Sequence, residues 1–312
     1  VIDRHCRWAI EAGLDGFIVS WWGHGSYEDR AMPAILAAWQ EHGLKACVYY
    51  ERVPEPVSAE SAAEDVVRVL TRYGSHLAYL KADGRPVVFV YGRAVNDIGM
   101  WSWHQAIEQI QSQCAGGAAL IGDQMSFASA SVFDGIHTYN TAASLQGLSW
   151  PEVGTWAGQT YSNWVGYANQ FDKISTLTVI PGYDDTKIRT PGLAVGRFDG
   201  LSYSEQWERA IAADPNWVLI TSFNEWHEGS EIEPSWEDGD KYLRLTRPYA
   251  AWFKSTGTET VVEPEPSLSP TQGELLALQD KLRDISIAVL PDPGSTAFWW
   301  LLSVKSDVRI LT

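Results

Sequence analysis

Residues 217–234 read W-V-L-I-T-S-F-N-E-W-H-E-G-S-E-I-E-P. The run from Trp217 to Ser222 is apolar and β-branched, and it follows the breaker pair Asp214-Pro215, so it predicts a buried strand. Two carboxylates, an imidazole and an indole follow within residues 224–229, directly after the carboxyl end of that strand. Parallel α/β folds place their chemistry at this end of their strands, so the stretch predicts both a fold class and a site.

Glu225 and Glu228 are the candidate catalytic pair in this stretch. If the chain bends after Asn224, residues three apart have Cβ atoms roughly 5–6 Å apart and face one volume. Two carboxylates crowded beside the apolar Trp226 cannot both ionise freely, so one becomes an acid and the other a base. Glycosidases use such a pair. The simpler interpretation is a solvated acidic loop with a packed Trp, but its position at a strand end favours a site.

The rest of the chain repeats the pattern of a strand followed by a helix. Six further apolar runs precede Trp217, at residues 16–21, 45–50, 86–91, 118–122, 134–138 and 176–181. This alternation predicts a largely parallel α/β fold. We favour a (β/α)₈ TIM barrel over a doubly wound sheet, because no G-x-G-x-x-G follows the first run and the acidic residues are spread over several strand ends.

Seven predicted strands are one fewer than a (β/α)₈ barrel requires. The chain opens on a helical pattern at residues 1–12 and begins with Val1 rather than Met. We therefore expect an amino-terminal truncation, with the first barrel strand upstream of Val1. An intact barrel with one unrecognised strand is the alternative.

Other strand ends add candidate binding residues. Trp21, Trp22 and His24 lie in the glycine-broken loop after residues 16–21, and Glu51 follows residues 45–50. The simpler interpretation is that Trp21 belongs to the core, that His24 is a loop residue and that Glu51 is a surface carboxylate. The stretch that carries Glu225 and Glu228 adds three further binding candidates, Asn224, Trp226 and His227.

One long segment shows no regular pattern. Residues 142–158 are rich in Gly, Ser and Trp, so we predict a long loop there, of the kind that often carries function. We predict that a helix follows at residues 161–173.

Charge and aromatic content restrict the ligand class. The chain has 23 basic and 39 acidic residues and a net charge of −16, which argues against nucleic acid and anionic membrane surfaces as partners. Sixteen Trp and thirteen Tyr against nine Phe favour rings with a polar edge, which suit sugars, although single Trp residues also fill cores. No apolar run is long enough to span a bilayer. We therefore predict an oligosaccharide or polysaccharide as the partner.

The sequence predicts no metal and no cofactor. Cys6, Cys47 and Cys114 are widely spaced and predict buried free thiols. His227 adjoins Glu228, but no second His stands at the spacing of a metal ligand. Bacterial periplasm, extracellular space and cytoplasm are all compatible with this composition.

The composition changes near residue 257. We predict a barrel domain at 1–256, an extended linker at 257–272 with the run E-P-E-P, and a tail at 273–312 that starts a second domain. In the tail, residues 273–285 predict an amphipathic helix, and the apolar run at 297–304 predicts a strand.

Six sequence blocks carry a family resemblance. They are G-L-D-G-F-I-V-S-W-W-G (13–23), Y-Y-E (49–51), D-G-R-P-V-V-F-V-Y (83–91), F-D-G-I-H-T-Y (133–139), P-G-Y-D-D-T-K-I-R (181–189) and S-F-N-E-W-H-E-G-S-E-I-E-P (222–234). In this order, over about residues 1–254, the chain resembles glycoside hydrolase family 99, the endo-α-1,2-mannosidases and mannanases, and the related family-99-like domains of bacterial polysaccharide loci.

The resemblance implies a (β/α)₈ barrel that cleaves α-mannosidic bonds with retention and without a metal. It implies that Glu225 deprotonates the 2-hydroxyl of the sugar, which attacks C1 to give a 1,2-anhydro sugar, while Glu228 acts as general acid/base. It further implies that Glu51 holds sugar hydroxyls and that Trp22 and Tyr139 line the site. Its block at 181–189 contributes two more binding candidates, Tyr183 and Asp184.

Two other functions compete with this one. A conventional retaining glycosidase would use Glu225 as acid/base and Glu51 as nucleophile, with carboxyl groups about 5 Å apart. A carbohydrate-binding barrel without turnover would use the same aromatic residues and cleave nothing.

Overall fold

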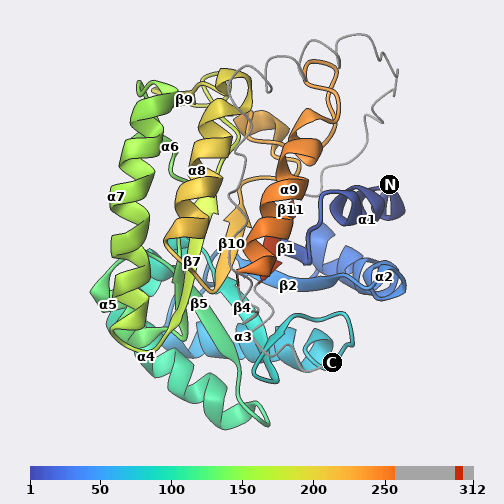
Figure 1. Cartoon of the computed structure of the whole chain (residues 1–312). Coiled ribbons are helices and arrows are strands. Elements are labelled where there is room, and N and C mark those ends of the chain that lie inside the picture. Colours follow the sequence, from blue (N-terminus) through green and yellow to red (C-terminus); the bar gives the residue numbers. More distant parts are fainter. Residues whose placement is uncertain (257–298, 305–312) are drawn as a thin grey trace.

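A computed structural model describes residues 1–256 and the backbone of residues 299–304, and helices alternate with strands along it (Figure 1). The strands of the main sheet are β1 (Gly16–Trp21), β2 (Lys45–Tyr50), β3 (Lys81–Ala82), β4 (Arg85–Val90), β5 (Ala119–Asp123), β6 (Gly135–His137), β7 (Ile174–Val179), β10 (Trp217–Ile220) and β11 (Trp299–Val304). The helices are α1 (Ile2–Glu11), α2 (Tyr27–His42), α3 (Ala59–Tyr73), α4 (Gly92–Gln113), α5 (Phe127–Val132), α6 (Ala142–Leu145), α7 (Trp150–Asn169), α8 (Leu201–Ala212) and α9 (Lys241–Ser255). All seven predicted strands are present within a residue or two of their expected bounds.

Strand pairing closes the sheet into a barrel. β1, β2, β4, β5, β6, β7 and β10 pair in this order, and each pair is parallel. β11 lies between β10 and β1 and pairs antiparallel with both, with Leu302 opposite Leu219 and Gly16. The predicted α/β barrel class is confirmed, and the strand predicted at 297–304 is present as β11. The strand expected upstream of Val1 and the domain division stay predictions, while the linker and the helix predicted at 273–285 lie outside the described residues.

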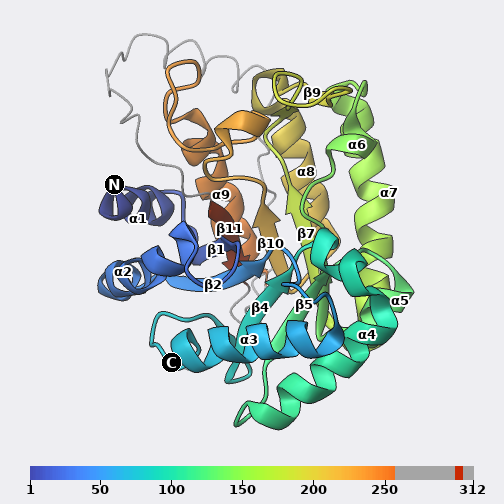
Figure 2. The same cartoon turned by 180° about the vertical axis from the view of Figure 1, so that it is seen from behind.

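Helices cover the outside of the strands, as Figures 1 and 2 show from opposite sides. Their ends follow local signals. Ser26 caps α2 by accepting a hydrogen bond from the backbone N–H of Asp29, and Gly43 ends the helix at a φ of 74°. Each connection brings the chain back to the end of the barrel where the previous strand began, so the paired strands run in the same direction. Their carboxyl ends therefore lie together at one end of the barrel.

The prediction of a long irregular segment at 142–158 is wrong, because only residues 146–149 of it lie outside helices α6 and α7. Helix α7 begins at Trp150, eleven residues before the predicted start at Tyr161. Ser149 and Glu152 form a capping box, and Pro151 lies in the first turn, so the sequence did carry a helix-start signal. Helix α5 was not predicted at all. No helix in the described part of the chain is long and apolar enough to span a membrane.

Candidate active site

A cavity of about 420 Å³ lies at the carboxyl ends of the strands. Its lining residues follow or end β1, β2, β4, β6 and β10, or belong to the segment after β7. They are Ser20, Trp22, Tyr49, Glu51, Tyr91, Arg93, Tyr139, Ile188, Arg189, Glu225, His227 and Glu228. The structure thus brings together six of the predicted site residues, from strands far apart in the sequence.

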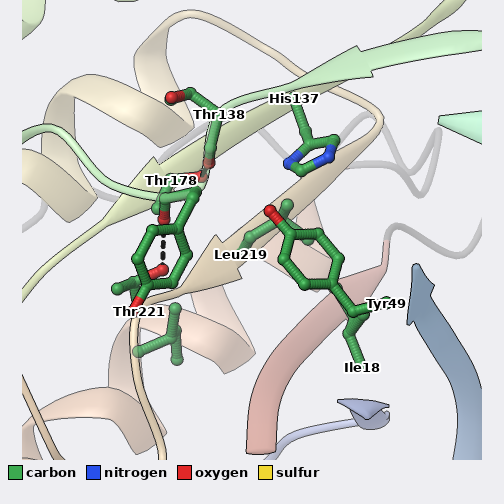
Figure 3. Close-up of a pocket in the computed structure, with 9 residues that line it drawn as sticks. Ile18, Tyr49, His137, Thr138, Thr178, Leu219 and Thr221 are labelled. Carbon is green, nitrogen blue, oxygen red and sulfur yellow. Dashed lines mark hydrogen bonds between the residues drawn. The ribbon is translucent and has the colours of Figure 1, made fainter. Parts of the chain in front are cut away.

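A smaller pocket shares Tyr49 and Tyr139 with this cavity and extends into the barrel interior (Figure 3). Figure 3 shows the Tyr49 and His137 side chains facing one another, and their ring centroids are 5.4 Å apart. His137 is buried, and burial lowers its pKa while the nearby Asp123 opposes this shift. These residues form a packed floor under the cavity.

The loop after β10 bends as the pairing of the two glutamates requires. A short 3₁₀ turn covers residues 226–228, and Gly229 follows at a φ of 56°. The hydroxyl of Ser222 accepts a hydrogen bond of 2.8 Å from the backbone N–H of Glu225, which fixes the start of the turn. Glu225 and Glu228 therefore both reach the cavity instead of pointing to opposite faces.

Glu228 is buried and lies in a network of donors. Its carboxylate accepts one hydrogen bond from the Tyr139 hydroxyl and another, 2.8 Å long, from the Arg189 guanidinium. Arg189 also pairs with Asp185 and donates to the Tyr183 hydroxyl over 2.8 Å. These two charge-assisted hydrogen bonds fix the orientation of the Glu228 carboxylate.

The pKa values of Glu225 and Glu51 are higher than those of ordinary glutamates. Burial and the charges of Glu228 and Glu51 together raise the pKa of Glu225 to about 8, although the charge of Arg189 opposes them. Burial also raises the pKa of Glu51 to about 7, although a 2.6 Å hydrogen bond from Ser20 and the charge of Arg93 lower it. Carboxyl groups with pKa values near neutral can gain and lose protons at working pH.

Two predicted candidates from the loop after β1 lie outside the cavity lining. Trp21 is buried in the core, where its indole N–H donates to Asp29 over 3.2 Å and its ring stacks on Tyr50. His24 lies 3.0 Å from the carboxylate of Asp65. Both side chains instead anchor the loop that carries Trp22 into the cavity lining.

Four more candidates surround the cavity without lining it. Tyr183 is buried beside Arg189, and Asn224 is buried as well. Asp184 is exposed and accepts hydrogen bonds from the backbone and hydroxyl of Thr186. Trp226 is 42% exposed, and its indole N–H donates to Glu233 over 2.9 Å.

Sequence reasoning missed half of the lining residues. Ser20 and Tyr49 are the penultimate residues of β1 and β2, and Tyr91 and Arg93 follow β4. A signal existed for these four, because they lie within three residues of a strand's carboxyl end. Ile188 and Arg189 lie well beyond β7, and no local pattern places them in the cavity.

Potential metal ligands and cysteines are the other groups that could form a site. Within residues 1–256 no group of three or more His, Cys, Asp or Glu side chains is arranged to hold a metal ion. Cys6, Cys47 and Cys114 are free thiols, and the first two are buried.

The raised pKa of Glu225 predicts a pH-dependent stability. Between pH 4.5 and about 8 the folded chain holds a proton on Glu225 that the unfolded chain has lost, so stability falls as pH rises through this window. Glu225→Gln removes the buried charge. We expect this variant to melt at a higher temperature than the parent at about pH 8.5 and to differ less at about pH 5. Calorimetry at both values tests this.

The control for this measurement is Glu64→Gln, which changes an exposed glutamate on α3. It should leave the difference in melting temperature between the two pH values as in the parent. An equal shift of Glu225→Gln at both pH values would contradict a raised pKa at this residue.

Known proteins are similar to this chain over most of its length. A family model described as glycosyl hydrolase family 99 matches residues 1–244. A glycoprotein endo-alpha-1,2-mannosidase of Xenopus laevis is 28% identical over 256 residues, which are 75% of this chain and 55% of that protein. A glycoprotein endo-alpha-1,2-mannosidase-like protein of Danio rerio is 27% identical over 292 residues, 81% of this chain and 63% of that protein.

A solved structure resembles this one over most of both chains. It is the GH99 endo-alpha-mannosidase of Bacteroides thetaiotaomicron in complex with bis-tris-propane, with a TM-score of 0.69 and 25% identity, covering 81% of this chain and 84% of that chain. The present chain spans between 55% and 63% of the length of the two curated relatives above.

Proposed function

Because the chain belongs to glycosyl hydrolase family 99, we propose that it is a glycoside hydrolase that cleaves α-mannosidic bonds inside an oligosaccharide or polysaccharide with retention of configuration. The observation that carries this proposal is that Glu225, Glu228 and Glu51, which follow two different strands, line one cavity at the barrel's carboxyl end. The α-1,2 linkage comes from the names of the relatives.

The first chemical step uses both carboxyl groups of the loop after β10. Glu225 takes the proton of the sugar's 2-hydroxyl, and that oxygen forms a bond to C1 as the bond from C1 to the leaving oxygen breaks. At neutral pH the two carboxyl groups share one proton, which lies on Glu228 in the form that reacts, and Glu228 gives this proton to the leaving oxygen. A pKa of about 8 makes Glu225 a strong base once it is ionised. The product of this step is a 1,2-anhydro sugar.

The second step reverses the proton transfers. Water attacks C1, Glu228 takes a proton from that water, and Glu225 returns its proton to the 2-oxygen as the three-membered ring opens. Two inversions at C1 give net retention. Tyr139 and Arg189 hold the Glu228 carboxyl group in place for both steps.

Substrate binding falls to the groups around the reacting carbon. The Glu51 carboxyl group, which accepts a hydrogen bond from Ser20, receives hydrogen bonds from sugar hydroxyls. Trp22 and Tyr139 supply aromatic surface for the apolar faces of the sugar rings. Because Glu51 lines the same cavity, a conventional scheme with Glu51 as nucleophile is the second candidate.

The test of this function is incubation of the whole chain with α-1,2-linked, α-1,6-linked and β-1,4-linked mannans, with products analysed by mass spectrometry. We expect short oligosaccharides from the α-1,2-linked polymer and none from the β-linked polymer. Cleavage of the β-linked mannan alone would overturn the proposed specificity. Tight binding of the α-linked polymers with no product from any of the three would instead identify a carbohydrate-binding barrel.

A further inference from the structure

Two guanidinium groups line the cavity, and their surroundings differ. Arg189 forms ion pairs with Asp185 and Glu228. Arg93 is exposed, and within residues 1–256 no carboxylate lies within ion-pairing distance of it. Arg93 therefore offers the cavity a positive charge that no residue of the described chain neutralises by direct contact.

Arg93 is held by two aromatic rings. Its guanidinium carbon lies 5.2 Å from the ring centroid of Trp22 and 5.8 Å from that of Tyr91, and both rings also line the cavity. Such contacts stabilise a cation and leave the N–H groups at its edge available to an acceptor. The guanidinium is thus oriented before a ligand arrives.

The loop that carries Trp22 is itself fixed by contacts outside the cavity. The backbone N–H of Gly25 donates to Asp29 over 2.9 Å, and His24 pairs with Asp65. This anchoring keeps the Trp22 ring in place under Arg93. The fold therefore already restricts the Arg93 side chain, and less conformational entropy is lost when a ligand binds.

Helix stability gives no reason for a cation at this position. Arg93 is the second residue of α4, and the positive end of a helix dipole disfavours basic side chains. The first turn of α4 contains no acidic residue that would offset the charge. The backbone N–H of Gly92, at the start of the helix, donates a hydrogen bond of 3.0 Å to Asp123.

We propose that Arg93 binds an anionic substituent, a carboxylate or a phosphate, on the sugar chain that occupies the cavity, so that acidic α-mannosides are preferred to neutral ones. A planar guanidinium can donate two parallel hydrogen bonds to either group. The proposal rests on the proposed function, because it names the class of substrate for the same site.

The charge balance of the cavity permits an anion despite the net charge of −16. Near neutral pH, Glu225 and Glu51 are partly protonated because burial raises the pKa of each. The negative charge of Glu228 is offset by Arg189. Arg93 then contributes a positive charge that forms no ion pair with a carboxylate of residues 1–256.

The experiment compares three forms of one polymer, namely an α-1,2-mannan, the same mannan bearing phosphate esters, and the same mannan oxidised at C6 to carboxylates. We expect the parent chain to have a kcat/KM roughly tenfold higher on at least one acidic form than on the neutral form. Arg93→Gln should remove that preference, and Arg93→Lys should keep part of it. The two acidic forms tell phosphate from carboxylate.

Arg4→Gln is the matched control, because Arg4 also lies over an indole, that of Trp8, at 5.4 Å from the ring centroid and away from the cavity. It should retain the preference of the parent. An equal loss of kcat/KM by Arg93→Gln on the neutral and acidic forms would overturn the inference. Arg93 would then act only by lowering the pKa of Glu51.

Failure of the proposed function can be separated from failure of this inference. If the parent chain cleaves none of the three polymers, calorimetric titration with the same polymers measures binding alone. Tighter binding of an acidic form that is lost in Arg93→Gln would support the inference without turnover. Equal binding of all three forms would overturn it.

Discussion

Glu225→Gln is expected to lower kcat on α-1,2-mannan by about a thousandfold, as loss of a general base does. The amide cannot take the proton of the sugar's 2-hydroxyl, so the 1,2-anhydro sugar does not form. Glutamine fills the same space, and within residues 1–256 the Glu225 side chain forms no ion pair that the change would break. Release of reducing ends over time measures the loss.

A second measurement shows which atom Glu225 acts on. A 2-deoxy-α-mannoside lacks the hydroxyl that attacks C1, so the parent chain should not cleave it at a measurable rate. Rapid cleavage of this compound would contradict the base role. A mass increase on Glu51 that corresponds to a covalently bound sugar would favour the conventional retaining scheme.

Glu228→Gln is expected to lower kcat on the same mannan by roughly a hundredfold to ten-thousandfold, the range for general acid–base groups. The loss should shrink on an α-mannoside with an activated aryl leaving group, which departs without a proton. It should not vanish, because the second step still needs a base to deprotonate water. Rates on both substrates give the comparison.

Glu237→Gln is the control for this variant, since Glu237 is an exposed carboxylate farther along the chain and does not line the cavity. It should keep the activity of the parent on both substrates. Full activity of Glu228→Gln on the aryl glycoside would show that another group is the acid/base.

Much of the fold could be predicted from the sequence because its signals are local. β1 and β2 begin and end at the predicted residues, since an apolar run specifies a strand within a few residues of itself. Helix α7 was misplaced because its aromatic and small residues obscured the helical period, although its capping box was present.

The strand-end rule also located the glutamates of the site. Glu51, Glu225 and Glu228 follow strands directly, and parallel strands of a barrel end together, so their meeting in one cavity follows from the sequence pattern. The rule did not separate Trp21 from Trp22. Neighbouring residues of an extended chain point to opposite sides, and burial against Asp29 and Tyr50 decided which indole faces the core.

The sequence by itself therefore determined the order of strands and helices, the family and the positions of three glutamates, because each depends on patterns of neighbouring residues. Only the tertiary structure decided which groups surround those glutamates. Arg189 reaches Glu228 across 39 residues of sequence, and Arg93 meets Trp22 from a different strand end. Closure of the barrel creates these contacts, and with them the burial that raises the pKa of Glu225 and Glu51.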